Sequence, residues 1–427
     1  MIDSTQSGLL VLKNITLLLY SYFLFVYFSM LANPTALEYL IYFLGAVYLL
    51  FYCKQIVLTP PFIFCVLIAA IPAISWLLMQ LQHPQLNAEM LGLREYLRMA
   101  FFLPLALMLR GEMRWIKILV AAFLLGLFFA PWVAGGLEAV LGAFAGSRLS
   151  FHLNPIRAGI LLTAAIILLL IYYQDVFKRP FSSTLIAFFL IAALYFSVML
   201  LLTQSRSALV ALAAGLFATA LVFMAIERIK LSKNTVFFAA LLTLVFLLFF
   251  YYLIQKLGLV DKTLPELQMV WSVITGQKSE IPNTSWGYRL QMWLLGVEYF
   301  MARPLSGWGN QGGELIMSLS GNAIFIERFD QLHNAYIEVL VRYGFFYLFL
   351  LWAFFLWVGW LLYLGYRQGV LVPCLFYPLL LLLLFYFFAN FFGSFLVRSD
   401  TERLFPILFG ISVSFYFQRF LVNKPHG

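Results

Sequence analysis

The sequence is dominated by apolar runs of about 20 residues, and these runs limit what the chain can fold into. A run of about 20 apolar residues, coiled as a helix, crosses the hydrocarbon core of a bilayer. Only 11% of the residues are charged, whereas soluble domains have about a quarter. The chain is therefore predicted to be an all-α polytopic membrane protein, because a helix satisfies its own backbone hydrogen bonds without water.

The runs between polar breaks predict about twelve transmembrane helices. The first run is longer than a signal-peptide core and follows no basic cluster, so it is predicted to be retained. The short run 95–109 contains Arg98 and is expected to be tilted, to start earlier, or to border a water-filled cavity. The predicted spans are residues 9–32, 35–53, 56–80, 95–109, 116–136, 157–173, 182–202, 208–225, 235–254, 335–363, 370–392 and 403–422.

The basic residues predict the orientation of these spans. An even number of spans places both termini on one side, and 13 of the 27 Lys and Arg residues fall on that side. Six of the other 14 lie in the long loop 255–333, and long translocated loops do not follow the positive-inside rule. Without that loop the count is 13 against 8, so both termini are predicted to be cytoplasmic.

The same division explains the net charge of +9. The predicted cytoplasmic side has 13 basic and 4 acidic residues, and the outer side has 14 of each. The charge therefore reflects orientation, and no nucleic-acid partner is expected. Three parts are predicted: spans one to nine in residues 1–254, a large outer loop with interfacial helices in 255–333, and spans ten to twelve with a short tail in 334–427.

Arginine is strongly enriched on the predicted outer side, which has eleven Arg and only three Lys. The planar guanidinium group binds phosphate or carboxylate through two hydrogen bonds, whereas Lys acts as a point charge. The outer face therefore favours anion recognition, although pairing with outer acidic residues also accounts for several of these arginines. The cysteines Cys53, Cys65 and Cys374 have no paired spacing and no nearby His, so neither a disulfide nor a metal site is expected.

The outer loop contains an amphipathic segment followed by a turn. In residues 287–301, the side chains of Leu290, Leu294, Val297 and Met301 share one helical face, which predicts a helix at the membrane interface. The turn 303–307 ends it. The following glycines Gly307, Gly309 and Gly312 match a dinucleotide-binding pattern, but no β-strand is expected before them, so a flexible, close-packed turn is predicted instead.

Of the four histidines, one differs in its setting. His83 and His152 fall in outer loops and His426 in the tail, where solvated side chains are the usual interpretation. His333 lies at the outer start of the tenth predicted span, a position that by itself favours capping or packing.

Further polar residues gather at the same face. Asn334, Glu338 and Arg342 repeat every four residues, so Glu338 and Arg342 are expected to form either a structural pair or part of a cavity wall. Arg206 lies in a very short outer connection and Arg289 begins the amphipathic segment. A last cluster, between the final two spans, consists of Arg398, Asp400, Glu402 and Arg403.

Three short segments together resemble the shared region of bacterial O-antigen ligases and O-antigen polymerases. They are residues 289–293 (RLQMW), residues 303–309 (RPLSGWG) and residues 333–338 (HNAYIE) with Gly344. The Ser205-Arg206 pair and the twelve-span layout extend the resemblance over most of the chain. It implies a membrane glycosyltransferase of the GT-C kind in the bacterial inner membrane, which takes a glycan from undecaprenyl pyrophosphate at the periplasmic face.

The resemblance also implies site residues. His333 matches the family's essential loop histidine, and Arg206 and Arg289 match its two essential arginines. A neutral His can accept the proton of an attacking sugar hydroxyl, and arginines can replace a metal ion beside the departing pyrophosphate. No Asp-rich metal motif occurs in an outer loop, so no metal and no cofactor is expected, and displacement in one step would invert the anomeric centre. Supporting roles are expected for Arg148, Arg157, Asn334, Glu338, Arg398, Asp400 and Arg403.

Two members of the superfamily differ in the acceptor. A ligase transfers the polysaccharide to the lipid A core, and a polymerase transfers it to another lipid-linked repeat. A length near 400 residues, one large outer loop and no appended soluble domain favour the ligase. The alternative from another class is a transporter or flippase of lipid-linked glycans, which would place its polar site near the bilayer midplane rather than at one face.

Overall fold

The computed structural model describes residues 4–82, 93–151, 153–176, 182–227, 275, 281, 284–396 and 399–422. Within these ranges, every regular element is helical. In chain order they are α1 (Ser4–Phe28), α2 (Thr35–Ile56), α3 (Pro60–Gln82), α4 (Leu93–Ala100), α5 (Phe102–Leu109), α6 (Met113–Ala134), α7 (Gly136–Phe144), α8 (Pro155–Leu169), η2 (Leu170–Tyr172), α9 (Tyr173–Val176), α10 (Ser183–Leu202), α11 (Arg206–Glu227), α14 (Ser285–Ala302), α15 (Gly312–Leu319), α16 (Ala323–Arg328), α17 (Ala335–Tyr343), α18 (Phe345–Arg367), α19 (Pro373–Ala389), α20 (Ser399–Glu402) and α21 (Leu404–Val422).

Eight helical segments of the described part are long and apolar enough to cross a membrane. They are α1, α2, α3, α6, α10, α11, α18 and the continuous segment from α8 to α9, and the apolar α19 is shorter. The prediction of a polytopic helical membrane protein is thus confirmed. The number of twelve spans and the orientation remain predictions, and the predicted span 235–254 lies outside the described residues.

Two predicted spans are wrong as single helices. The run 95–109 forms the short helices α4 and α5, separated at Phe101, and every residue of α5 is buried. The run 335–363 is interrupted at Gly344, whose φ is +80°. A Cβ atom at Gly344 would lie 2.4 Å from the carbonyl oxygen of Leu305, so the backbone of another loop lies against this position and only glycine fits.

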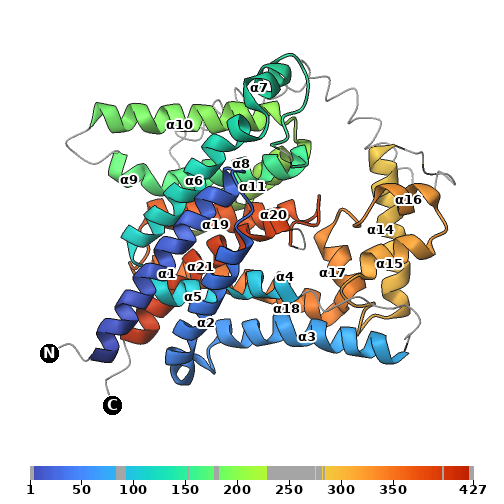
Figure 1. Cartoon of the computed structure of the whole chain (residues 1–427), viewed down its shortest axis with the longest axis horizontal. Helices are drawn as coiled ribbons and strands as arrows, with labels where there is room; N and C mark the ends of the chain where they lie inside the picture. Colours follow the sequence, from blue (N-terminus) through green and yellow to red (C-terminus); the bar gives the residue numbers. More distant parts are fainter. Residues whose placement is uncertain are drawn as a thin grey trace.

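The helices form one bundle with an extension at one end (Figure 1). The start of α1 and the end of α21 lie at the left of that view, and α14, α15 and α16 lie at the right. Helix α14 confirms that the predicted segment is helical, and its residues Leu294, Val297 and Met301 are exposed. The predicted interfacial face therefore lies on the surface of the protein.

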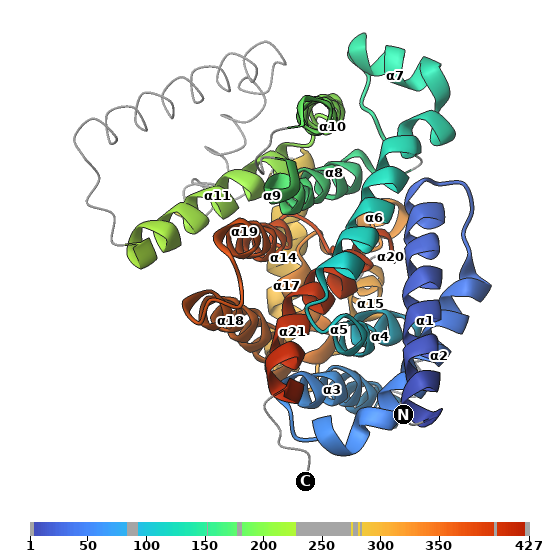
Figure 2. The same cartoon turned by 90° about the vertical axis from the view of Figure 1, so that its left-hand side faces the viewer.

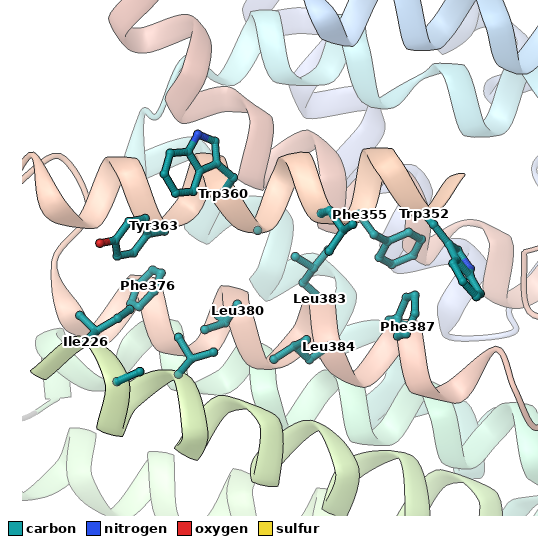
Figure 3. A pocket seen from close by; sticks show the side chains of 14 residues that line it. Ile226, Trp352, Phe355, Trp360, Tyr363, Phe376, Leu380, Leu383, Leu384 and Phe387 are labelled. Carbon is teal, nitrogen blue, oxygen red and sulfur yellow. The ribbon is translucent and has the colours of Figure 1, made fainter. Parts of the chain in front are cut away.

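An apolar groove runs between α11, α18 and α19 (Figure 3). Its volume is about 580 Å³, and its walls are almost wholly apolar. Trp352 and Phe387 lie at one end of the groove, and Tyr363 and Ile226 lie at the other. Large exposed apolar side chains elsewhere, such as Phe188 on α10, are typical of a surface that faces lipid.

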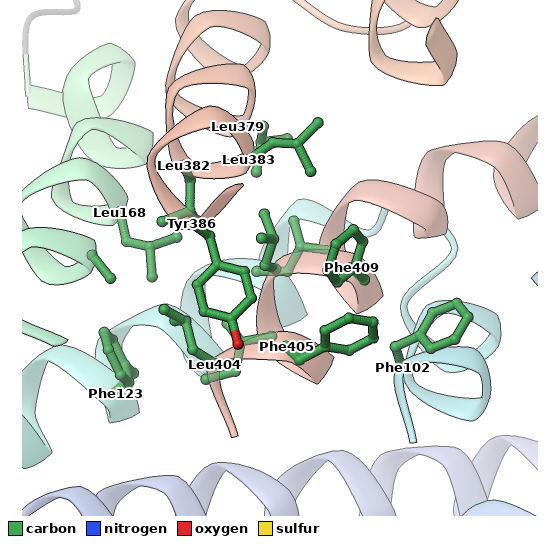
Figure 4. Packing of buried hydrophobic residues seen from close by; sticks show 14 of the residues in the cluster. Phe102, Phe123, Leu168, Leu379, Leu382, Leu383, Tyr386, Leu404, Phe405 and Phe409 are labelled. Atoms are coloured by element: carbon green, nitrogen blue, oxygen red, sulfur yellow. The ribbon is translucent and has the colours of Figure 1, made fainter. Parts of the chain in front are cut away.

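The core lies where α5, α6, α8, α19 and α21 meet, as Figures 2 and 4 show. Helix α21 packs along α5 at the centre of the bundle. Phe405 and Phe409 of α21 are fully buried, and their rings are 4.2 Å apart between centroids. Helices from both sides of the long loop meet here, because α19 packs against α8 and α11.

A buried ion network joins the first helices of the chain to the last. The Glu38 carboxylate on α2 accepts hydrogen bonds from Arg98 Nε at 3.0 Å and from Arg403 Nη2 at 3.0 Å. Arg98 Nη1 also pairs with Glu402 Oε2 at 3.2 Å. All four side chains are buried, and the Arg403 guanidinium stacks 3.7 Å from the centroid of the Tyr27 ring. The network therefore holds α2, α4 and α20 together.

Loss of Glu38 is expected to destabilise the protein, because Arg98 and Arg403 would keep buried charges with one fewer partner. Glu38→Gln should lower the free energy of unfolding by about 3 to 5 kcal/mol. The matched control is Asp175→Asn, which removes the partner of Lys117 where the two side chains are 30% and 34% exposed, and it should change stability by less than about 1 kcal/mol. Thermal unfolding in detergent measures both, and equal midpoints would show that the network does not stabilise the fold.

Candidate active site

The loop between α7 and α8 docks on the turn between α10 and α11. Leu149 N donates to Leu202 O at 3.0 Å, and Gln204 Nε2 donates to Gly146 O at 3.1 Å. Arg148 Nε donates to Thr203 O at 3.3 Å. These bonds place Arg148 of the loop beside the turn that precedes Arg206.

Three arginines from separate segments line one cavity of about 220 Å³. We call it the arginine pocket, and it is lined by Arg148, Arg206 and Arg289 together with Gln204, Ile156 and Phe392. The Arg289 guanidinium lies 5.6 Å from the centroid of the Trp286 ring, whose side chain also lines the pocket. The structure thus brings together two predicted site residues and one predicted supporting residue.

The electrostatics of the arginine pocket favour an anion. Burial lowers the pKa of Arg148, and the nearby charge of Arg206 lowers it further. Among the described residues, no aspartate or glutamate lines this pocket. A phosphate group would relieve the repulsion between the guanidinium groups and accept bidentate hydrogen bonds from them.

His333 lines a small cavity next to the arginine pocket. We call it the histidine niche, and its volume is about 20 Å³. It is lined by Arg157, Gln331, His333 and Ser394 together with Ile156 and Phe392. Because Ile156 and Phe392 line both cavities, the histidine niche and the arginine pocket adjoin.

The backbone around His333 is held from both sides. The Glu338 Oε2 atom accepts a hydrogen bond from Leu332 N at 2.8 Å, and Trp293 Nε1 donates to Leu332 O at 2.9 Å. His333 itself has a φ of +55°, a left-handed conformation that is uncommon outside glycine. The Asn334 side chain, and not His333, caps α17 by accepting from Tyr336 N and Ile337 N. His333 is thus presented by a fixed turn.

Asn390 is a further positioning residue, which the sequence interpretation did not identify. Its carbonyl oxygen accepts from Ala335 N at 2.9 Å, and its Oδ1 accepts from Leu396 N at 3.1 Å. The buried Asn390 therefore joins the start of α17, through its backbone carbonyl, to the loop that contributes Phe392 and Ser394 to the histidine niche, through its side chain. The available signal was a single amide within the aromatic run of residues 385–395.

The family comparison covers most of this site. Residues 191–352 match the family model described as O-Antigen ligase, and the match includes Arg206, Arg289 and His333. This region of the chain therefore resembles the O-antigen ligase family. No curated protein matches the sequence.

Glu338 belongs to the support of the site and lines neither cavity. Its Oε1 atom accepts from Arg342 Nε at 2.8 Å, and both side chains are buried. A Cβ atom on Gly313 of α15 would lie 2.2 Å from Glu338 Oε1, so the backbone of α15 packs against the carboxylate. Of the two expected roles of the Glu338–Arg342 pair, the geometry matches the structural one.

The glycine turn also has a packing role. Trp308 N donates to Val341 O at 2.8 Å and Gly309 N donates to Arg342 O at 2.9 Å. A Cβ atom at Gly307 would lie 2.4 Å from the backbone of Arg342. The turn after α14 is therefore packed tightly on the end of α17, which confirms the close packing predicted for this segment.

One predicted residue lies apart from the two cavities, and others fall outside the described part of the chain. Arg403 belongs to the buried network with Glu38 and lines neither cavity. The structure does not describe Arg398 or the Asp400 side chain. His83, His152 and His426 also lie outside the described residues.

The Trp293 hydrogen bond is expected to fix the turn that carries His333. Trp293→Phe keeps an aromatic ring but removes the donor to Leu332 O, so amide exchange in residues 331–336 should become about tenfold faster. Trp308→Phe is the matched control, because it removes an indole hydrogen bond of 2.8 Å to Tyr299 O in the same region. Hydrogen–deuterium exchange with mass spectrometry compares the two, and equal exchange in residues 331–336 would contradict this role of Trp293.

Proposed function

We propose that this protein transfers O-antigen polysaccharide from undecaprenyl pyrophosphate to the lipid A core, at the periplasmic face of the inner membrane. The observation that carries the proposal is the contact between the arginine pocket and the histidine niche through Ile156 and Phe392. An anion site beside a base is what transfer from a pyrophosphate donor requires.

The chemistry proceeds as one displacement. His333 accepts the proton of an acceptor hydroxyl while the oxygen of that hydroxyl attacks the anomeric carbon of the donor sugar. The bond between that carbon and the phosphate oxygen breaks, and undecaprenyl pyrophosphate leaves with the electron pair. Arg206 and Arg289 stabilise the developing charge, with Arg148 at the same pocket. The reaction inverts the anomeric configuration and uses no metal ion.

The apolar groove between α11, α18 and α19 supports a lipid-linked donor. At one end of the groove, the rings of Trp352 and Phe387 contact the ring of Tyr336. The distances between ring centroids are 5.6 Å for Trp352 and 5.5 Å for Phe387. Tyr336 in turn lies 4.6 Å from the ring of Phe391, the neighbour of Phe392 in the arginine pocket. A polyprenyl tail in the groove would therefore have its pyrophosphate end toward the arginines, and this occupant fits apolar walls.

The decisive experiment supplies two competing acceptors. Purified protein in liposomes receives undecaprenyl-pyrophosphate-linked polysaccharide, lipid A core and a lipid-linked repeat, all in excess EDTA. We expect polysaccharide on the lipid A core, and His333→Ala should abolish transfer while donor binding stays within about twofold. Product on the lipid-linked repeat instead would identify an O-antigen polymerase. Dependence on a divalent ion, or activity in His333→Ala, would contradict the mechanism.

Arg206 and Arg289 are expected to bind the pyrophosphate through the planar, two-pronged geometry of the guanidinium group. Arg206→Lys and Arg289→Lys should each lower the turnover number by about tenfold to a hundredfold, because one ammonium group cannot make the bidentate contacts. Arg303→Lys is the matched control, since Arg303 lies at the end of α14 and lines neither cavity. Steady-state transfer rates compare the three. If the two pocket variants keep the turnover of the control, the pyrophosphate assignment is wrong.

A further inference from the structure

Ser394 is a buried hydroxyl in the wall of the histidine niche. The side chain is only 2% exposed, and its Oγ atom has no hydrogen-bond partner among the described residues. A buried polar group without a partner is destabilising, so it needs an explanation wherever it occurs. Its place beside His333 suggests that the partner of Ser394 is a ligand.

The size of the niche limits what this ligand is. A volume of about 20 Å³ accommodates roughly one water-sized group and no sugar ring. The walls combine polar groups of Arg157, Gln331 and Ser394 with the aromatic rings of Phe392 and Phe395. Such a space fits a single hydroxyl group that projects from a sugar lying outside the niche.

The loop that carries Ser394 is rigidly placed. Asn390 Oδ1 accepts from Leu396 N at 3.1 Å, and Thr401 Oγ1 donates to Phe395 O at 3.2 Å. The same Asn390 accepts from Ala335 N with its carbonyl oxygen, two residues after His333. One buried residue, Asn390, therefore contacts both walls of the niche through its backbone carbonyl and its side chain, and the Ser394 hydroxyl has a fixed position relative to the His333 turn.

We propose that the histidine niche holds the attacking hydroxyl of the acceptor sugar, and that Ser394 Oγ is its second hydrogen-bond partner beside His333. The inference rests on the proposed function and adds a substrate-contacting residue to it. Ser394 Oγ donates to the acceptor oxygen while His333 takes the proton of that oxygen. Ser394 itself gains and loses no proton, the new bond joins the acceptor oxygen to the anomeric carbon, and the pyrophosphate leaves with the electron pair.

The test compares two serines, each of which has a buried hydroxyl group without a hydrogen-bond partner among the described residues. Ser412 on α21 is also fully buried, and its Oγ likewise has no partner among the described residues, but it does not line the niche. Ser394→Ala and Ser412→Ala each remove such a hydroxyl, so neither should lower the thermal midpoint. With the acceptor that the wild-type protein uses, Ser394→Ala should lower kcat/KM for the acceptor by about tenfold. Ser412→Ala should leave it within about twofold, and donor affinity should stay within twofold in both.

The outcomes separate the two ideas. If wild-type protein transfers the glycan and His333→Ala does not, but Ser394→Ala behaves like Ser412→Ala, the function stands and the role of Ser394 is wrong. If Ser394→Ala weakens donor binding as much as it slows transfer, Ser394 belongs to the donor site and the inference is also wrong. If wild-type protein transfers to neither acceptor, the proposed function fails and the inference fails with it.

Discussion

Backbone hydrogen bonding in apolar surroundings is the constraint on which this structure depends. In these surroundings a backbone N–H or C=O group cannot form a hydrogen bond with water. The chain is therefore helical, except where other protein groups form hydrogen bonds with the backbone. Five non-glycine residues of the described part have positive φ, and three of them, Phe151, Gln204 and His333, lie in the segments that build the site. The cost of these conformations is met by specific partners, such as Glu338 and Trp293 on either side of the Leu332 peptide.

The protein uses arginine in two physically different ways. Arg98 and Arg403 are buried against Glu38, with Glu402 pairing with Arg98, so their charge is compensated within the fold. Arg148, Arg206 and Arg289 converge on a pocket whose described lining has no carboxylate. The first set holds helices together, and the second set is proposed to bind an external anion. The number of arginines and their positions in the sequence do not separate these two sets. The sets differ in whether carboxylates from other helices pack beside the guanidinium groups.

The fold class was predictable because the apolar content of each short segment determines whether that segment inserts into the membrane as a helix. Apolar runs and flanking charges identify helices such as α6 and α10 directly, and the amphipathic pattern identifies α14. The errors came where distant segments act on a helix. Gly344 divides α17 from α18 because the carbonyl of Leu305 lies against it, and Arg98 is accommodated because Glu38 and Glu402 come from other helices. Neither contact is visible in a hydropathy pattern.

The sequence by itself determined that the chain is a helical membrane protein, and its motifs pointed to His333, Arg206 and Arg289. Only the tertiary structure decided that Arg148 joins the two arginines, and that Arg403 instead serves the buried network. It also decided the positions of Asn390 and Ser394, which the sequence does not mark. The physical reason is that membrane insertion is governed by short-range apolar content. A site of a few polar groups is assembled by packing between helices far apart in the chain.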